Sequence, residues 1–226
     1  MKYDITNIPV GEIFEERDGC PVCRLRNTLE TRAVEYITGA AMMEPDIRIE
    51  TNRLGFCITH YRMMLRQRNR LGVALILESH LEETQKQVFA GVLPSARRQA
   101  KNAAKKTDTC FVCTKVDEAM DKMLDTVCRT WEQQADFRRL FEQQPYLCLP
   151  HFSALVAASQ EAMSKKEQPY FAKAAAALAE NYMKELRGDI RHFADMYDYR
   201  NGENADWGNS RDAVERAIAF LTTREP

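Results

Sequence analysis

The sequence is organised around CPVC at residues 20–23, and CITH at residues 57–60 follows it after 33 intervening residues. The same order returns in the second half of the chain as CFVC at residues 110–113 and CLPH at residues 148–151. The two CxxC motifs lie 90 residues apart and the two CxxH motifs lie 91 residues apart. Cysteines placed in a core for packing alone would not repeat in this register. The repeat therefore predicts an internally duplicated chain with one CxxC and one CxxH motif in each half.

These motifs carry the residue types that bind zinc in proteins. A CxxC turn brings two sulfurs to one side of a bend, and a CxxH turn brings one sulfur and one ring nitrogen, so two turns complete a tetrahedron. Four protein ligands leave no coordination position open, as in structural zinc sites. We therefore expect two structural zinc ions per chain, each held by the two motifs of the same half. The expected ligands are Cys20, Cys23, Cys57 and His60 in the first half, and Cys110, Cys113, Cys148 and His151 in the second.

The gap between the two motifs of one half is longer than in short zinc fingers, so the chain must be able to return. A helix from Cys23 to about Ala40 would carry the chain roughly 26 Å away. The next 16 residues, 41–56, can span up to about 50 Å when extended. Pairing within each half is therefore geometrically feasible.

Other uses of these cysteines compete with zinc. A disulfide framework would need an oxidising compartment. A thioredoxin-like redox pair usually accompanies a βαβ pattern, which this sequence lacks, and it gives no reason for a paired CxxH motif. An iron–sulfur cluster could be held by three cysteines and a histidine, and it stays the main alternative metal group.

Composition places the chain among soluble globular proteins. Its 226 residues are 45% hydrophobic and 29% charged, with a formal net charge of −1. A net charge near zero creates no field that would draw the protein to nucleic acid or membrane. Residues 1–7 hold no apolar run and no stretch reaches 18 apolar residues, so we expect neither a signal peptide nor a membrane span. Reduced, metal-binding cysteines favour a cytoplasmic location.

Apolar residues recur three or four positions apart after both CxxC motifs, which predicts an all-α protein. The stripes are Leu25, Leu29, Ala33, Tyr36 and Ile37 after the first motif, and Met120, Leu124, Val127 and Trp131 after the second. We expect two pseudo-repeated helical units, each pinned by zinc where two helices begin. The expected domains are residues 1–92 for the first unit, 93–109 for a basic linker, and 110–226 for the second unit with an extra C-terminal helix.

The linker carries the strongest local charge of the chain. Its basic residues are Arg97, Arg98, Lys101, Lys105 and Lys106. Such a run can contact phosphate, but it has no interleaved aromatic residues on which bases could stack. We interpret it as a solvated linker or short helix and not as a nucleic-acid surface.

Four residues outside the motifs carry chemistry. Cys128 lies on an apolar stripe and is predicted to be a buried, inert thiol. His80 and His192 are each predicted to be either exposed or buried in the core with hydrogen-bond partners. Asp189 and His192 lie three positions apart on one helix face and offer an alternative metal or proton-relay pair. Glycine-rich phosphate loops and serine-nucleophile motifs are missing from the sequence.

The paired motifs resemble a bacterial family of unknown function with a duplicated CxxC…CxxH plan over nearly the whole chain. The resemblance rests on GFCITH at residues 55–60 and YLCLPH at residues 146–151, together with both CxxC motifs. It implies the helical duplicated plan and the eight metal ligands, and it implies no activity.

We expect a non-enzymatic cytoplasmic module for interaction or ligand sensing, in which zinc is purely structural. A metal- or redox-responsive regulator would use the same cysteines but needs them exposed and exchangeable. An enzyme with a pocket between the halves would use groups such as His192, Asp189 or Asp195. The expected partner is an unidentified protein or small molecule, with neither membrane nor nucleic acid, and a homodimer is left open.

Overall fold

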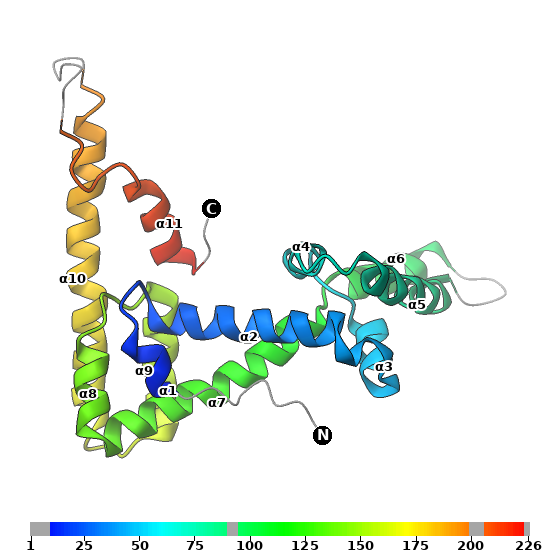
Figure 1. Cartoon of the computed structure of the whole chain (residues 1–226), viewed down its shortest axis with the longest axis horizontal. Helices are drawn as coiled ribbons and strands as arrows, with labels where there is room; N and C mark the ends of the chain where they lie inside the picture. The colour runs from blue at the N-terminus through cyan, green and yellow to red at the C-terminus, as the bar shows by residue number, and fades with distance from the viewer. Residues whose placement is uncertain (1–9, 90–94, 199–205, 224–226) are drawn as a thin grey trace. The chain divides into compact units, whose positions relative to one another are not determined.

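The computed structural model describes residues 10–89, 95–198 and 206–223. Within these ranges it contains helices and no strand, which confirms the expected all-α fold (Figure 1). The α-helices are α1 Val10–Glu15, α2 Pro21–Thr38, α3 Pro45–Leu54, α4 Ile58–Arg66, α5 Arg70–Phe89, α6 Ala96–Thr107, α7 Phe111–Gln133, α8 Ala135–Glu142, α9 Leu149–Ala162, α10 Gln168–Asp195 and α11 Ala213–Thr222, and the 3-10 helix η1 is Ala40–Met43.

Each of the four motifs opens a helix, as the sequence predicts. Helices α2, α4, α7 and α9 all begin one residue after the first cysteine of a motif. Cys57 and Cys148 are the N-cap residues of α4 and α9, with extended backbone. Pro21 and Pro150 fit the first turn of their helices because that turn does not use their missing N–H groups.

The predicted apolar stripes of α2 and α7 are buried, because residues three or four apart lie on one helix face. Leu25, Leu29, Ala33 and Ile37 on α2 are all buried, while Tyr36 is half-buried. Met120, Leu124, Val127 and Trp131 on α7 are buried as well.

By its internal contacts the chain divides into two compact units. Unit 1 comprises residues 1–6 and 27–120, and unit 2 comprises residues 7–26 and 121–226. The division falls inside α2 and α7, whereas the expected boundaries follow residues 92 and 109. The reason is that α2 and α7 are unbroken helices, each of which belongs to one unit at its start and to the other at its end.

The expected basic linker is largely a helix. Residues 96–107 form α6, which packs against α5 within unit 1. Ser95 caps α6 by accepting a hydrogen bond from the backbone N–H of Arg98. Residues 93 and 94 of the expected linker lie outside the described residues.

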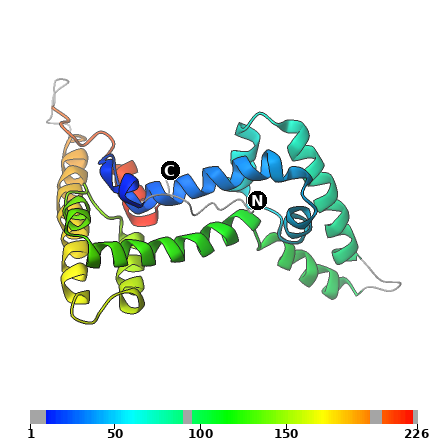
Figure 2. The ribbon, with the colours of Figure 1, turned by 60° about the horizontal axis from the view of Figure 1, so that its bottom comes forward.

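In unit 1, α5 packs against α3, α4 and α6 (Figure 2). Arg48 on α3 donates to the backbone oxygen of Leu75 and to Ser79 Oγ on α5, at 2.8 and 2.7 Å. Asn69 Nδ2 donates to the backbone oxygen of Thr38 at 2.7 Å, which fixes the start of α5 to the end of α2. These bonds hold α3 against α5 and fix the start of α5 within unit 1.

In unit 2, α10 packs against α8, α9 and α11 around an aromatic core (Figure 1). Phe14 on α1 lies 4.9 Å from Phe137 and 5.8 Å from Phe141 between ring centroids. Phe171 lies 5.3 Å from both Phe141 and Trp131. Each aromatic pair contributes about 0.5–1.5 kcal/mol beyond the burial of its area, so this core holds α1, α7, α8 and α10 together.

Candidate metal centres

The eight predicted ligands form two clusters, and each cluster combines motifs from both halves of the sequence. Within each cluster the potential ligand atoms all lie within 4.8 Å of one another. The pairing within each half that the sequence analysis expects is therefore wrong, while the eight residues are the expected ones. The unit 1 cluster consists of Cys57, His60, Cys110 and Cys113, and the unit 2 cluster consists of Cys20, Cys23, Cys148 and His151.

The pairing is crossed because the return segment is not extended. Helix α2 is continuous over 18 residues, which corresponds to about 27 Å. The segment that would have to span this length back is folded into η1 and α3. The first CxxH motif therefore stays in unit 1, while the first CxxC motif lies in unit 2.

In the unit 1 cluster the imidazole of His60 meets three sulfurs through one nitrogen. His60 Nδ1 lies 3.2 Å from Cys57 Sγ, 3.3 Å from Cys110 Sγ and 3.5 Å from Cys113 Sγ. The two motifs are tied by the backbone N–H of Phe111, which donates to the oxygen of Gly55 at 2.9 Å.

The unit 2 cluster has the same arrangement. His151 Nδ1 lies 3.8 Å from Cys20 Sγ, 3.3 Å from Cys23 Sγ and 3.1 Å from Cys148 Sγ. The sulfurs of Cys23 and Cys148 are 3.6 Å apart. Two independent clusters thus present one nitrogen and three sulfurs with closely similar spacing.

These spacings fit a single tetrahedral ion. Metal–sulfur bonds of about 2.3 Å and metal–nitrogen bonds of about 2.0 Å place tetrahedral ligand atoms roughly 3.5–3.8 Å apart. The nitrogen–sulfur separations in the two clusters are 3.1–3.8 Å, and the sulfurs of Cys57 and Cys113 lie 3.9 Å apart. Both clusters are therefore compatible with one four-coordinate ion without rearrangement of the backbone.

Electrostatics also favour a cation at the centre of each cluster. In the unit 2 cluster burial opposes ionisation, yet hydrogen bonds from Cys148 and Cys23 lower the pKa of Cys20. Hydrogen bonding to Cys20 raises the pKa of Cys148 to about 12, and hydrogen bonds with Cys148 and Cys20 raise the pKa of Cys23. One thiolate thus suppresses ionisation of its neighbours, and a divalent cation removes that repulsion.

The position of the motifs at helix N-termini and the burial of most of the eight side chains also favour metal binding. Each motif lies at a helix N-terminus, whose free N–H groups and partial positive charge stabilise thiolates. His60, Cys110, Cys148, Cys20 and His151 are buried. The other three ligands, Cys23, Cys57 and Cys113, are partly exposed.

Glu30 on α2 lies behind the imidazole of the unit 1 cluster, a feature that the sequence analysis missed. Its Oε1 is 3.9 Å from His60 Nε2, the ring nitrogen that faces away from the sulfurs. At 3.9 Å this contact is longer than a hydrogen bond. A carboxylate that closes to hydrogen-bond distance from this place orients a metal-bound imidazole and raises its basicity. The residue 90 positions later is Met120, so the repeat does not supply the same group to His151.

Replacing Glu30 by glutamine is expected to weaken metal retention in the unit 1 cluster by about 10- to 100-fold. The position equivalent to Glu30 in the second half is Met120, so metal retention in the unit 2 cluster should be unchanged. When a chromophoric chelator competes for the metal, the time course of metal release should therefore change from one phase to two. Glu35→Gln on the same helix, at an exposed position, is the matched control, and equal weakening of both clusters would refute the assigned role of Glu30.

Gly55 sets the turn into the first CxxH motif. Its φ is +62°, and an added Cβ would lie 2.7 Å from His80 Nε2. His80 is held there because its Nδ1 lies 2.9 Å from the backbone oxygen of Asn52. His80 therefore packs against this turn, which agrees with a structural role and not with a ligand role.

Gly55→Ala is expected to lower the free energy of unfolding by about 1–3 kcal/mol, since both the backbone angle and the space require glycine. Chemical denaturation of the protein with its metal sites filled measures this change. Gly188→Ala is the control, because nothing lies within 4 Å of a Cβ at that helical position. A neutral Gly55→Ala variant would show that the turn and His80 readily shift.

The remaining singled-out residues lie outside both clusters. Cys128 is buried, as predicted, and burial raises its pKa to about 12. Asp189 accepts hydrogen bonds from Arg216 and Asn209, at 2.9 and 3.2 Å. His192 Nε2 lies 2.9 Å from the backbone oxygen of Asp206. These contacts connect α10 to the segment around α11, and they do not join Asp189 and His192 into one site.

Fold and clusters together define an all-helical protein with two four-ligand Cys/His clusters, each built from one CxxC and one CxxH motif. The chain belongs to the family of unknown function DUF6062, which it matches over residues 1–226. No curated protein and no solved structure matches the chain. Among the described residues, no helix combines the length and apolar character that crossing a membrane requires.

Proposed function

We propose that the protein is a zinc-bound, non-enzymatic module for interaction or ligand sensing in the cytoplasm, with two structural metal sites. One observation carries the metal part of this proposal. Each cluster brings together motifs that are far apart in the sequence, such as those of Cys20 and His151, which lie 131 positions apart. An ion at such a junction stabilises the fold of its unit directly.

The donor set supports zinc over an iron–sulfur cluster. Three thiolates and one imidazole fill a tetrahedral zinc site and leave no position for substrate. A cluster with several irons would spread its protein ligands around a larger inorganic core, whereas these ligand atoms lie within 4.8 Å of one another. The same closure favours a structural ion over a catalytic one.

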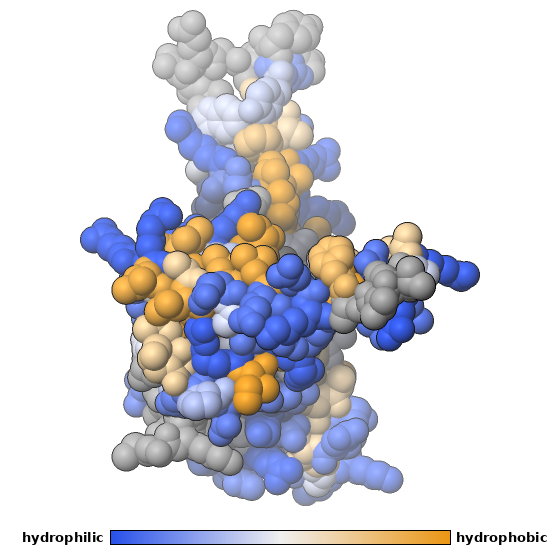
Figure 3. All heavy atoms as spheres, turned by 90° about the vertical axis from the view of Figure 1, so that its right-hand side faces the viewer, coloured by the Kyte–Doolittle hydropathy of each residue, from blue (hydrophilic) through white to orange (hydrophobic). Residues whose placement is uncertain are grey.

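Exposed hydrophobic residues support the interaction role. Ile58 and Leu65 are 64% and 45% exposed and lie seven positions apart, on the same face of α4. Met43, Ile49 and Leu71 in unit 1 are also exposed. Figure 3 shows hydrophobic residues gathered among hydrophilic ones on one face of the molecule. Apolar surface of this kind is typical of contacts with a protein partner, including a second copy of the chain.

A metal- or redox-responsive regulator is the second candidate. It is favoured by the partial exposure of Cys23, Cys57 and Cys113, because each cluster then has at least one sulfur that oxidants can reach. An enzyme using Asp189 and His192 is less well supported, since both side chains form contacts that stabilise the fold.

Mild peroxide treatment distinguishes the two candidates. For structural sites we expect two zinc ions per chain and slow zinc release, because buried ligands and neighbours such as Phe111 and Leu147 shield the sulfurs. Zinc release is followed with a chromophoric chelator, and Cys128→Ala serves as a control for the non-ligand thiol. Release within seconds, with a disulfide between Cys20 and Cys23, would establish the regulator instead.

A further inference from the structure

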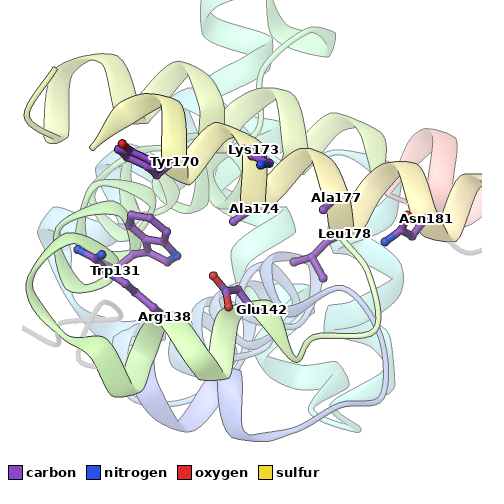
Figure 4. A pocket seen from close by; sticks show the side chains of 9 residues that line it. All are labelled: Trp131, Arg138, Glu142, Tyr170, Lys173, Ala174, Ala177, Leu178 and Asn181. Carbon is purple, nitrogen blue, oxygen red and sulfur yellow. The ribbon is translucent and has the colours of Figure 1, made fainter. Parts of the chain in front are cut away.

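A cleft of about 510 Å³ lies in unit 2 between α8 and α10, with the end of α7 closing one end (Figure 4). Its floor on α10 is apolar and consists of Ala174, Ala177 and Leu178. The indole of Trp131 forms the end wall, and Tyr170 lies beside it. A volume of this size accommodates a small metabolite.

The indole N–H of Trp131 is a buried donor without a partner. The side chain is 2% exposed, and Nε1 has no hydrogen-bond acceptor among the described residues. Figure 4 shows the nitrogen edge of the ring turned towards the cleft and Glu142. A buried donor without a partner is costly, and buried indoles usually find one. An acceptor supplied by a ligand would satisfy it.

Arg138 belongs to the wall of the cleft and not to its binding groups. Its guanidinium stacks 4.4 Å from the centroid of Trp131. It also donates to the backbone oxygens of Trp131 and Glu132, both at 2.7 Å, and pairs with Glu167 at 3.3 Å. The N–H groups of Arg138 are thus directed towards the protein, and its guanidinium holds the indole of Trp131 in place.

Two oppositely charged side chains of the cleft are available to bind a ligand. Glu142 on α8 and Lys173 on α10 line the cleft from its two sides, and both are exposed. Neither forms an ion pair with another residue in the part of the chain that the structure describes. One carboxylate, one ammonium group and an apolar floor between them complement a molecule that carries both charges and an apolar group.

We propose that this cleft binds a small zwitterion of the apolar amino-acid class. Its ammonium group pairs with Glu142, its carboxylate pairs with Lys173 and accepts from Trp131 Nε1, and its side chain packs on Ala177 and Leu178. Trp131 Nε1 is shielded from solvent, so the ligand's carboxylate reaches it when the exposed Glu142 side chain turns outward. In that position Glu142 pairs with the ligand's ammonium group. The inference rests on the ligand-sensing role proposed above and supplies its ligand class.

The fluorescence of Trp131 tests this inference directly. The chain has two tryptophans, so the Trp207→Phe variant of the full zinc-loaded protein leaves Trp131 as its only indole. Titration with L-leucine should give a saturable shift in emission. N-acetyl-leucine and leucinamide each lack one charge and should bind at least about tenfold more weakly, since a hydrogen-bonded charge is lost. No saturable shift with any apolar amino acid, or equal binding of N-acetyl-leucine, overturns the proposal.

Matched variants identify the groups that bind. Glu142→Gln and Lys173→Met should each weaken leucine binding by about tenfold or more. Glu185→Gln and Lys165→Met, at exposed positions of unit 2 that do not line the cleft, should leave it unchanged. Zinc content is measured in the same samples. If the protein holds two zinc ions but does not bind leucine, only the proposed ligand class is wrong. If it binds leucine but holds no zinc, only the metal proposal is wrong. Tight binding of a leucine-containing tripeptide, but not of leucine, overturns the free amino acid in favour of a peptide.

Discussion

The double variant Cys20→Ser/Cys148→Ser is expected to lose one of two zinc ions, whereas Cys20→Ser/Cys57→Ser is expected to lose both. Cys20 and Cys148 belong to the same cluster, while Cys20 and Cys57 belong to different clusters. Serine cannot replace a thiolate in a site that needs three of them. Native mass spectrometry with metal analysis counts the ions that remain in each variant.

This comparison separates crossed pairing from pairing within each half, because the two arrangements predict opposite results for the same variants. Pairing within each half would leave one ion in Cys20→Ser/Cys57→Ser and none in Cys20→Ser/Cys148→Ser. Cys128→Ser should keep both ions, since that sulfur lies outside the clusters and contacts the backbone oxygen of Leu155. A brown chromophore in the purified protein would indicate an iron–sulfur group and contradict zinc.

Removal of both ions is expected to lower the melting temperature by more than about 10 °C. Structural zinc contributes roughly 10–16 kcal/mol of apparent binding free energy in zinc-finger peptides, and about 5 kcal/mol already corresponds to such a shift for a chain of this size. The long helices α7 and α10, with 23 and 28 residues, should keep part of their helicity through their own packing. Circular dichroism before and after chelation measures both quantities.

Readdition of zinc is the control, and it should restore the original melting temperature. We expect the packing around each cluster to loosen first, because the ion holds the two motifs together in addition to contacts such as the backbone hydrogen bond from Phe111 to Gly55. Chelation that removes both ions and leaves the melting curve unchanged would contradict structural sites. It would favour a regulator that exchanges its metal.

Local sequence patterns predicted much of this molecule. The helix starts at all four motifs follow from the motifs themselves, and the buried faces of α2 and α7 follow from spacings such as Leu25 to Leu29. These features depend on residues three or four positions apart, so the sequence displays them directly. Cys128 is buried for the same reason, because it lies on the apolar stripe of α7.

The eight residues of the two clusters were likewise predictable from the repeat, but their pairing was not. Pairing depends on whether residues 39–56 are extended or folded, and η1 and α3 fold them. Glu30 behind His60 and the unpartnered indole of Trp131 next to Glu142 also depend on contacts between distant helices. The helices and the residues of both clusters therefore follow from local sequence patterns. Which motifs meet depends on the folded chain, because helix packing, and not motif spacing, sets the path between them.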